Sequence, residues 1–284
     1  MTPIEVRRWG SAGPEVVLLH GGPGAPGGLA ALARDLAAGF RVLEPLQRRA
    51  GEVPLTVARH VADLAEVAPP RAHVVGHSWG AMLGLSYAAR HPERVTSLAL
   101  VGCGTYDAAT RGEFQRAVEA RTDDAMRARY AELRLRLAEA RDPAERDALL
   151  ARRGRVSAAV YAVDLLDEDD GGLGVDERGH VETWDDVLRL QAQGAEPAAF
   201  AAIRAPVHMF HGDDDPHPGP AIRELLRRWI PQLEYTGFAR CGHEPWRERH
   251  AREPFLRALE AWLRAAGNPG GSPAMLRRGT EEPP

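Results

Sequence analysis

Residues 76–80 (Gly-His-Ser-Trp-Gly) carry the strongest chemical signal in the chain. An apolar run at 72–75 precedes them, and helix-forming residues follow from Trp79 to about Arg90. A buried strand that enters a helix through Gly-x-Ser-x-Gly is a nucleophile elbow, a tight turn that exposes the serine hydroxyl above the sheet. The glycines lack side chains, so the strand and the helix can pass close together. The pattern predicts Ser78 as a nucleophile, and the alternative is an ordinary strand–helix turn.

A serine hydroxyl needs a base to accept its proton. His243 is the strongest candidate, since it follows the last predicted strand, Leu233–Phe238, and precedes the last predicted helix, Trp246–Ala265. His250 is expected inside that helix and His217 just beyond an acidic turn. Neither of these two lies directly at the end of a strand, so the sequence favours His243 as the general base.

The acid that orients the base is expected in the acidic turn after the predicted strand 205–211. Three adjacent carboxylates, Asp213, Asp214 and Asp215, cannot all face one imidazole. Asp215 is preferred because the residue before a proline is held extended and because it lies farthest from the strand end. Asp213 and Asp214 remain alternatives, and a solvated loop without a catalytic task is the competing interpretation.

Acyl transfer also needs hydrogen-bond donors for the oxyanion of the transition state. One backbone N–H is expected from Trp79, the residue after the nucleophile. The second is expected from Gly22, in the glycine loop that follows the predicted strand Val16–His20, with Gly21 as the second choice. A phosphate-binding loop is disfavoured because no Gly-Lys-Ser or Gly-Lys-Thr follows these glycines.

Alternating strands and helices must position these residues. Compact apolar runs predict strands at 16–20, 40–43, 72–75, 95–101, 205–211 and 233–238. Helices are predicted between them at 29–38, 55–67, 79–90 and 222–229. This alternation predicts an α/β fold with a doubly wound, mostly parallel sheet and helices on both faces.

The alternation stops between residues 105 and 195, where the sequence is helical and heavily charged. One helix there carries an apolar stripe with helical spacing, formed by Met126, Tyr130, Leu133 and Leu137. Asp142-Pro143 predicts the start of a second helix, and Trp184–Gln193 predicts a further short one. We therefore expect a helical cap inserted into the α/β domain.

The domain prediction follows from this pattern. Residues 1–104 and 196–267 are expected to form the α/β core, and residues 105–195 the cap. Residues 268–284 are rich in glycine and proline and are predicted to be a disordered tail.

Composition limits the class of protein. The 284 residues carry a net charge of −4, which gives no electrostatic footprint for nucleic acid. Two cysteines are too few for a disulfide framework, which fits a reducing compartment. No secretory signal is visible and no apolar run approaches the length of a membrane span, so a cytoplasmic protein without a membrane partner is expected. The motifs imply a small-molecule substrate, with no metal and no cofactor.

Four motifs in this order resemble the α/β-hydrolase superfamily: His-Gly-Gly-Pro-Gly at 20–24, Gly-His-Ser-Trp-Gly at 76–80, Gly-Asp-Asp-Asp-Pro at 212–216 and Gly-His at 242–243. The resemblance extends from about Val6 to Ala265. The first two motifs look most like the proline iminopeptidase branch. This similarity implies an oxyanion hole formed by Gly22 and Trp79 and a triad acid at Asp215.

The chain departs from that branch in two places. Relatives carry an Asp-x-Arg-Gly-x-Gly-x-Ser loop after the second core strand, whereas Glu44–Gly51 is shorter and lacks the serine. Proline iminopeptidases hold the substrate's free amine with cap glutamates. The acidic stretch 167–170 is the candidate for this role here, with a solvated loop as the favoured interpretation.

The sequence thus predicts a serine hydrolase that cleaves a small-molecule ester or amide through an acyl-enzyme. Ser78 attacks, His243 acts as base and then as acid, and Asp215 fixes the imidazole tautomer. Dehalogenases and epoxide hydrolases are disfavoured because they need an aspartate nucleophile. The motifs do not separate esterases, lactonases and carbon–carbon hydrolases. An aminopeptidase is one alternative, and a non-catalytic binding protein on the same fold is another.

Overall fold

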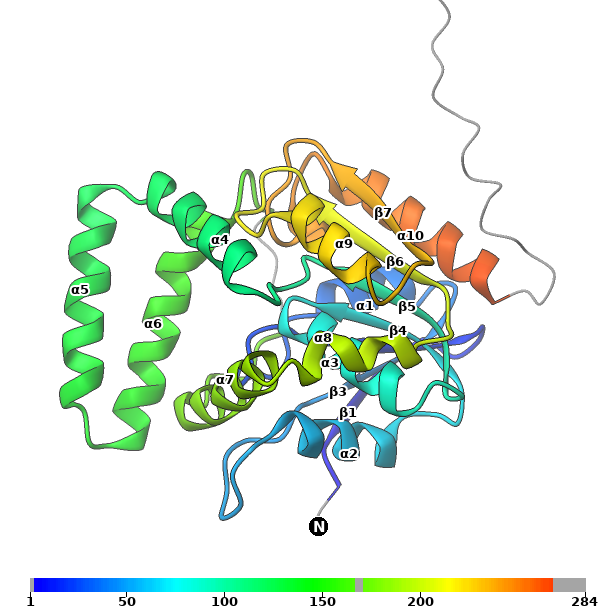
Figure 1. Ribbon diagram of the computed structural model, residues 1–284, viewed down its shortest axis with the longest axis horizontal. Coiled ribbons are helices and arrows are strands. Elements are labelled where there is room, and N and C mark those ends of the chain that lie inside the picture. The colour runs from blue at the N-terminus through cyan, green and yellow to red at the C-terminus, as the bar shows by residue number, and fades with distance from the viewer. Residues whose placement is uncertain (1–2, 167–170, 268–284) are drawn as a thin grey trace, which may run out of the picture.

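The computed structural model describes residues 3–166 and 171–267. Its centre is a seven-stranded sheet with the order β1-β3-β2-β4-β5-β6-β7 (Figure 1). The strands are β1 Val6–Trp9, β2 Glu15–Leu19, β3 Arg41–Pro45, β4 Ala72–His77, β5 Val95–Val101, β6 Val207–Gly212 and β7 Leu233–Phe238. Among the described strand pairs of this sheet, β1 with β3 is antiparallel and the others are parallel. The predicted mostly parallel sheet is confirmed.

Strand β1 was not predicted from the sequence. Its residues, Val-Arg-Arg-Trp, are half-buried or exposed, because β1 lies at the edge of the sheet and pairs with β3 alone. An edge strand with this composition gives no continuous apolar run, which is the signal that revealed the buried parallel strands.

Helices cover both faces of the sheet, as predicted. The helices of the α/β part are α1 Ala30–Leu36, α2 Val57–Val67, α3 Trp79–Arg90, α8 Ala195–Ala198, α9 Gly219–Arg227 and α10 Arg252–Ala266. In β2, Val17 and Leu19 pack in the core under α2, α3 and α9. Val16 and Leu18 pack in the core under α1 and α10. Successive side chains of a strand point to opposite faces, so β2 contributes to both cores and is wholly apolar after its first residue.

The last helix begins later than the sequence predicted. Pro245–Arg247 form a short 3-10 helix, and α10 starts at Arg252 rather than at Trp246. Glu248 has an extended backbone, and its buried carboxylate accepts backbone N–H groups from distant segments. These long-range hydrogen bonds hold Glu248 out of the helix. His250 accordingly lies in the turn before α10, not inside it.

Between β5 and the short α8, the described part of the chain forms four longer helices: α4 Ala108–Arg121, α5 Asp124–Glu139, α6 Pro143–Tyr161 and α7 Glu177–Ala192. Each follows an aspartate whose side chain accepts a backbone N–H of the first turn. The helix start predicted at Asp142-Pro143 is confirmed. Helix α7 starts seven residues before the predicted Trp184, since Gly179 weakened the helical pattern in its first turn.

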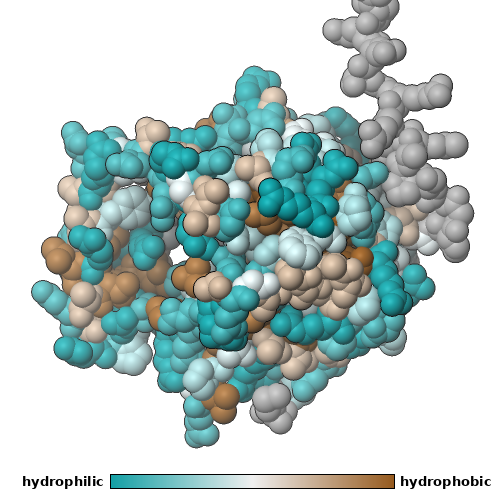
Figure 2. Space-filling model, viewed as in Figure 1, coloured by the Kyte–Doolittle hydropathy of each residue, from teal (hydrophilic) through white to brown (hydrophobic). Residues whose placement is uncertain are grey.

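Helices α5 and α6 form a pair that stands beside the α/β part in Figure 1. Leu133 and Leu137, from the predicted apolar stripe, pack with Leu149 and Val156 of α6. Figure 2 shows hydrophobic surface gathered on this pair, beside a hollow that faces α7. The acidic stretch 167–170 and the predicted tail 268–284 lie outside the described residues. Within the described ranges, every helix is too short or too polar to cross a bilayer.

Candidate active site

Ser78 occupies a sharp turn between β4 and α3. Its backbone has φ 54° and ψ −118°, a left-handed conformation that is rare outside glycine. A Cβ on Gly76 would collide with the carbonyl oxygen of Gly80, and a Cβ on Gly80 with that of Leu19. Both glycines are therefore required by close backbone packing. Strain of this kind persists only where the surroundings enforce it, and it is common at functional sites.

Asp215 and His243 are hydrogen-bonded across two loops. His243 Nδ1 lies 2.7 Å from Asp215 Oδ2, and the Asp215 side chain is fully buried. Asp213 is exposed and Asp214 half-buried. The structure thus brings Asp215, rather than Asp213 or Asp214, to the imidazole. The bond engages Nδ1 and leaves Nε2 as the ring nitrogen open to the cavity.

The other oxygen of Asp215 binds His217, which the sequence had ranked as a weak candidate for the base. Asp215 Oδ1 accepts the His217 backbone N–H at 2.9 Å and lies 2.8 Å from the His217 Nδ1 atom. His211 Nε2 lies 3.4 Å from Asp215 Oδ2. Three imidazoles therefore surround one carboxylate. Asp215, the third carboxylate of the acidic turn, is therefore buried and hydrogen-bonded rather than solvated.

The pKa values of this cluster follow from burial and charge. Burial alone would raise the pKa of Asp215, but the imidazoles of His243, His217 and His211 hold it well below its usual range. Burial alone would lower the pKa of His243, yet the Asp215 charge and hydrogen bond raise it. Burial lowers the pKa of His217, against the attraction of Asp215. The structure therefore favours an ionised Asp215 and makes His243 the more basic of the two imidazoles that line the cavity beside it.

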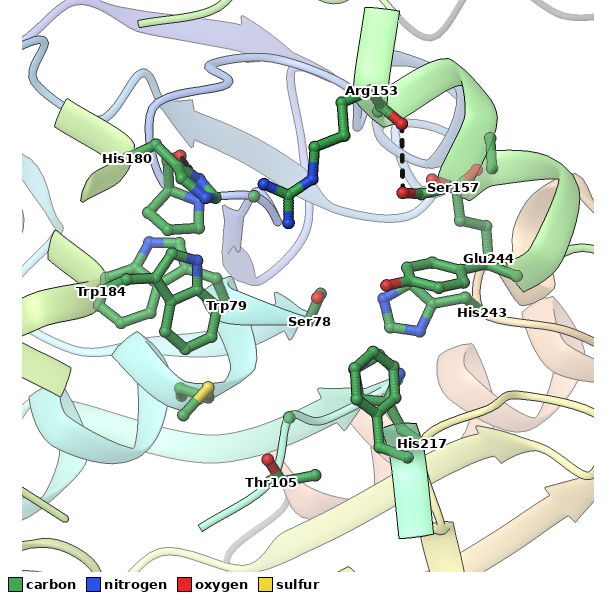
Figure 3. A pocket seen from close by; sticks show the side chains of 18 of the residues that line it. Ser78, Trp79, Thr105, Arg153, Ser157, His180, Trp184, His217, His243 and Glu244 are labelled. Atoms are coloured by element: carbon green, nitrogen blue, oxygen red, sulfur yellow. Dashed lines mark hydrogen bonds between the residues drawn. The ribbon is translucent and has the colours of Figure 1, made fainter. Parts of the chain in front are cut away.

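Ser78 and His243 line one cavity of about 540 Å³, together with Gly22, Trp79 and His217. Figure 3 shows the Ser78 side chain and the His243 ring directed into the same space. Within the described part of the chain, the Ser78 hydroxyl has no hydrogen-bond partner. A hydrogen bond between a nucleophile and its base is often long or poorly aligned before substrate binds, and it shortens in the complex.

The loop expected to provide oxyanion donors is held by a residue that the sequence did not single out. Gln47 donates from its side chain to the His20 carbonyl at 3.0 Å, and its backbone N–H donates to the His20 ring at 3.1 Å. The Trp79 indole donates to the Gln47 amide oxygen at 2.6 Å. Gly22 has φ 52°, which favours glycine. Gln47 lies in the short segment 44–51, where the chain departs from the iminopeptidase motif. Through its hydrogen bonds to His20 and Trp79 it connects the two segments that are expected to provide the oxyanion donors.

A family model described as alpha/beta hydrolase fold matches residues 59–246. The chain belongs to the α/β-hydrolase family. The superfamily resemblance drawn from the motifs is thereby confirmed, and the protein is a hydrolase.

Individual relatives of this α/β-hydrolase are named for ester and related hydrolysis. It is 30% identical to a pimeloyl-(acyl-carrier protein) methyl ester esterase of Aromatoleum aromaticum over 247 residues, covering 82% of this chain and 92% of the relative. It is 28% identical to a 2-hydroxy-6-oxononadienedioate/2-hydroxy-6-oxononatrienedioate hydrolase of Burkholderia vietnamiensis, covering 90% and 88%. The solved structure of a thermophilic esterase from Thermogutta terrifontis matches with a TM-score of 0.61 at 18% identity, covering 93% and 94%. These relatives do not support the narrower resemblance to proline iminopeptidases.

A second unpredicted residue of this α/β-hydrolase, Glu248, supports the loop that carries His243. Its carboxylate accepts the backbone N–H groups of Gly242 at 3.0 Å, Val163 at 2.9 Å and Asp164 at 2.7 Å. The His243 N–H donates to the Tyr161 carbonyl at 2.8 Å. The His243 loop is therefore tied to the end of α6. No local pattern marks Glu248, because its partners come from two other segments.

Among the described residues, one group of side chains has the spacing of metal ligands, namely Asp215, His217 and His243. Their carboxylate oxygens and Nδ1 atoms already bind one another at 2.7–2.8 Å. A metal ion held by these same atoms would have to replace both hydrogen bonds. The observed geometry fits an acid that orients two imidazoles.

Proposed function

We propose that this hydrolase is a serine esterase that cleaves a small-molecule ester through an acyl-enzyme. The observation that carries the proposal is the 2.7 Å hydrogen bond between His243 and buried Asp215, beside the same cavity that strained Ser78 lines. Nucleophile, orienting acid and base then follow one another along the chain as Ser78, Asp215 and His243, the order typical of the α/β-hydrolase fold. The esterase and hydrolase relatives support the reaction class.

In this mechanism the Ser78 hydroxyl attacks the ester carbonyl while His243 Nε2 accepts its proton. The ionised Asp215 holds the Nδ1 proton and stabilises the imidazolium. Backbone N–H groups of Gly22 and Trp79 stabilise the oxyanion. The intermediate then collapses, the carbon–oxygen bond breaks, and His243 returns the proton to the departing alcohol. A water molecule, deprotonated by His243, releases the acid product and regenerates Ser78.

Helices α4–α7 act in this proposal as a cap over the cavity, consistent with a core of residues 1–104 and 196–267 and a cap of 105–195. The cap side supplies Phe114 from α4, Tyr161 from α6, and Trp184 from α7. Catalytic groups come from loops of the α/β part. This division would let the cap determine which substrates reach Ser78.

An aminopeptidase is the second enzymatic possibility, and the cavity disfavours it. A free amine requires carboxylates near the cleaved bond. Among the described residues, Glu244 is the acidic side chain that lines the cavity, and it is already 2.8 Å from Arg247. A purely binding role is disfavoured because it would give no reason for the strained Ser78 or for the buried Asp215–His243 pair.

The proposal is tested with a short-chain aryl ester, 4-nitrophenyl butyrate, and a fluorophosphonate probe. We expect wild-type enzyme to hydrolyse the ester and to be labelled at Ser78. Ser78→Ala should lose both, with a fall in kcat of at least about a thousandfold, while its circular dichroism is unchanged. Retained hydrolysis in a clean Ser78→Ala preparation would refute the mechanism. Cleavage of N-terminal prolyl amides in preference to the ester would favour the aminopeptidase.

A further inference from the structure

The cavity is lined by two arginines and one glutamate as formally charged residues: Arg111, Arg153 and Glu244. Glu244 is ion-paired with Arg247 at 2.8 Å. Arg111 donates to the side-chain oxygen of Gln191, an uncharged amide. Within the described residues, neither Arg111 nor Arg153 has a carboxylate partner. Among the described residues, no carboxylate therefore pairs with these two positive charges of the cavity.

Arg153 is distinguished from the other arginine on the same helical face. Arg146, seven residues earlier in α6, donates to both carboxylate oxygens of Glu177, from Nη2 at 2.6 Å and from Nε at 2.8 Å. A spacing of seven residues places Arg153 on nearly the same face, two turns further along. No acidic side chain meets Arg153 there in the part of the chain that the structure describes. The Arg146 guanidinium thus binds α6 to α7, whereas the Arg153 guanidinium has no carboxylate partner among the described residues.

The Arg153 side chain extends from α6 into the cavity, towards the space between His180 and Ser78 (Figure 3). The Ser157 hydroxyl, one turn further along α6, donates to the Arg153 carbonyl at 3.2 Å. Burial is the main reason that the pKa of His180 is lowered, and the positive charge of Arg153 lowers it further. The guanidinium therefore lies close enough to the His180 side of the cavity to act on it electrostatically.

A guanidinium is always charged and presents a planar set of N–H donors that matches a carboxylate. Arg153 is exposed at the edge of the cavity, so its guanidinium can be hydrated, and a neutral substrate would offer it no charged partner. A substrate with a carboxylate would pair with it and gain charge-assisted hydrogen bonds. The cavity geometry thus favours an anionic substrate over a neutral one of the same shape.

We propose that Arg153, supported by the charge of Arg111, binds a carboxylate on the substrate, so that the preferred esters carry an acidic group in addition to the ester bond. This inference rests on the proposed esterase function and specifies its substrate class. Arg153 is a specificity-determining residue in this scheme and takes no part in the chemical steps at Ser78.

Two pairs of esters test the proposal, each matching a charged member with a neutral one. The acyl pair is mono-4-nitrophenyl glutarate and 4-nitrophenyl valerate. The alcohol pair is the butyrate ester of 4-hydroxybenzoate and that of 4-hydroxybenzamide. We expect wild-type enzyme to favour the charged member of at least one pair in kcat/KM. Arg153→Gln should reduce that charged-to-neutral ratio by about twofold to fivefold, since an ion pair at an exposed arginine contributes up to about 1 kcal/mol.

Arg152→Gln is the matched control, because Arg152 is an equally exposed neighbour on the same helix that does not line the cavity. The control should keep the wild-type ratio, and Arg153→Lys should retain part of it because the charge remains. Equal rates for both members of both pairs, or a preference that survives in Arg153→Gln, would overturn the proposal. Failure of the esterase function itself is recognised separately, since then no ester would be cleaved in a Ser78-dependent way.

Discussion

The rings of His217 and His243 are stacked with their centroids 4.7 Å apart and an angle of 21° between their planes. Their Nδ1 atoms bind opposite oxygens of Asp215, at 2.8 and 2.7 Å. Phe114 stacks on the other side of His217, at 4.3 Å. His217 therefore shares the carboxylate on which the basicity of His243 depends. It also lies between that carboxylate and Phe114 of helix α4.

This arrangement predicts a specific pH dependence. His243 must be unprotonated to act as base, and its pKa is raised above the ordinary 6.5. The value of kcat/KM should therefore fall as the pH is lowered, with a midpoint above pH 6.5. Replacing His217 by Phe removes a hydrogen bond from Asp215, leaving its charge more available to His243. We expect His217→Phe to move the midpoint upward by about half a unit to one unit.

The pH profile of kcat/KM for 4-nitrophenyl butyrate measures this shift. His250→Phe is the control, because His250 is exposed and does not line the cavity. Other groups also surround His243, namely His77, Tyr161 and Glu244, and both variants leave them in place. An unchanged midpoint in His217→Phe would show that the second imidazole does not tune the base.

The assignment of the triad acid is tested by comparing three amides. Asp215→Asn cannot hold the Nδ1 proton as the carboxylate does, so kcat should fall on the order of 10⁴-fold, as for other triad acids. Asp213→Asn and Asp214→Asn should each stay within about threefold of wild type, because neither side chain lies at the imidazole. Steady-state kinetics with the aryl ester measures all three. A larger loss in either control than in Asp215→Asn would transfer the role to that residue.

Glu248 is predicted to stabilise the fold and to position His243. Glu248→Gln keeps the shape of the side chain but removes the charge and one acceptor oxygen. Hydrogen bonds to a buried charged group contribute about 1.5–3 kcal/mol each, so the free energy of unfolding should fall by about 3 kcal/mol. Urea unfolding measures this change, and kcat should fall with it because the His243 loop loses its anchor.

The control for this variant is Glu253→Gln, at an exposed ion pair on α10. It should change stability by less than about 0.5 kcal/mol. If the two variants unfold at the same urea concentration, the three hydrogen bonds of Glu248 contribute nothing to stability.

The elbow glycines are predicted to be essential for folding. A Cβ at position 80 would meet the backbone carbonyl of Leu19, which cannot move without displacing β2. Gly80→Ala should therefore lower the free energy of unfolding by about 3 kcal/mol or prevent folding. Gly154→Ala is the matched change, since no heavy atom lies within 4 Å of a Cβ there. It lies inside α6 and should increase stability by up to about 1 kcal/mol, as thermal unfolding would show. An equal loss at both positions would refute the packing argument.

The sequence alone was sufficient for the parts of the protein that depend on neighbouring residues. The elbow at 76–80, the buried parallel strands and the aspartate that begins α6 each follow from a short window of residues. Turn chemistry, apolar runs and helix caps act over a few positions, so their physical causes are visible in the chain. The motif order also led correctly to the α/β-hydrolase fold.

Tertiary structure decided what depends on distant segments. Asp215 and His243 are 28 positions apart, and Glu248 binds an N–H 85 positions away. The packing of β6 against the last loop decides which carboxylate of the acidic turn reaches the imidazole. The same packing lets His217 share that carboxylate. The orientation of Arg153 depends likewise on where α6 lies relative to the α/β part. Side-chain burial and charge pairing at such distances are set by packing, which no local pattern of residues records.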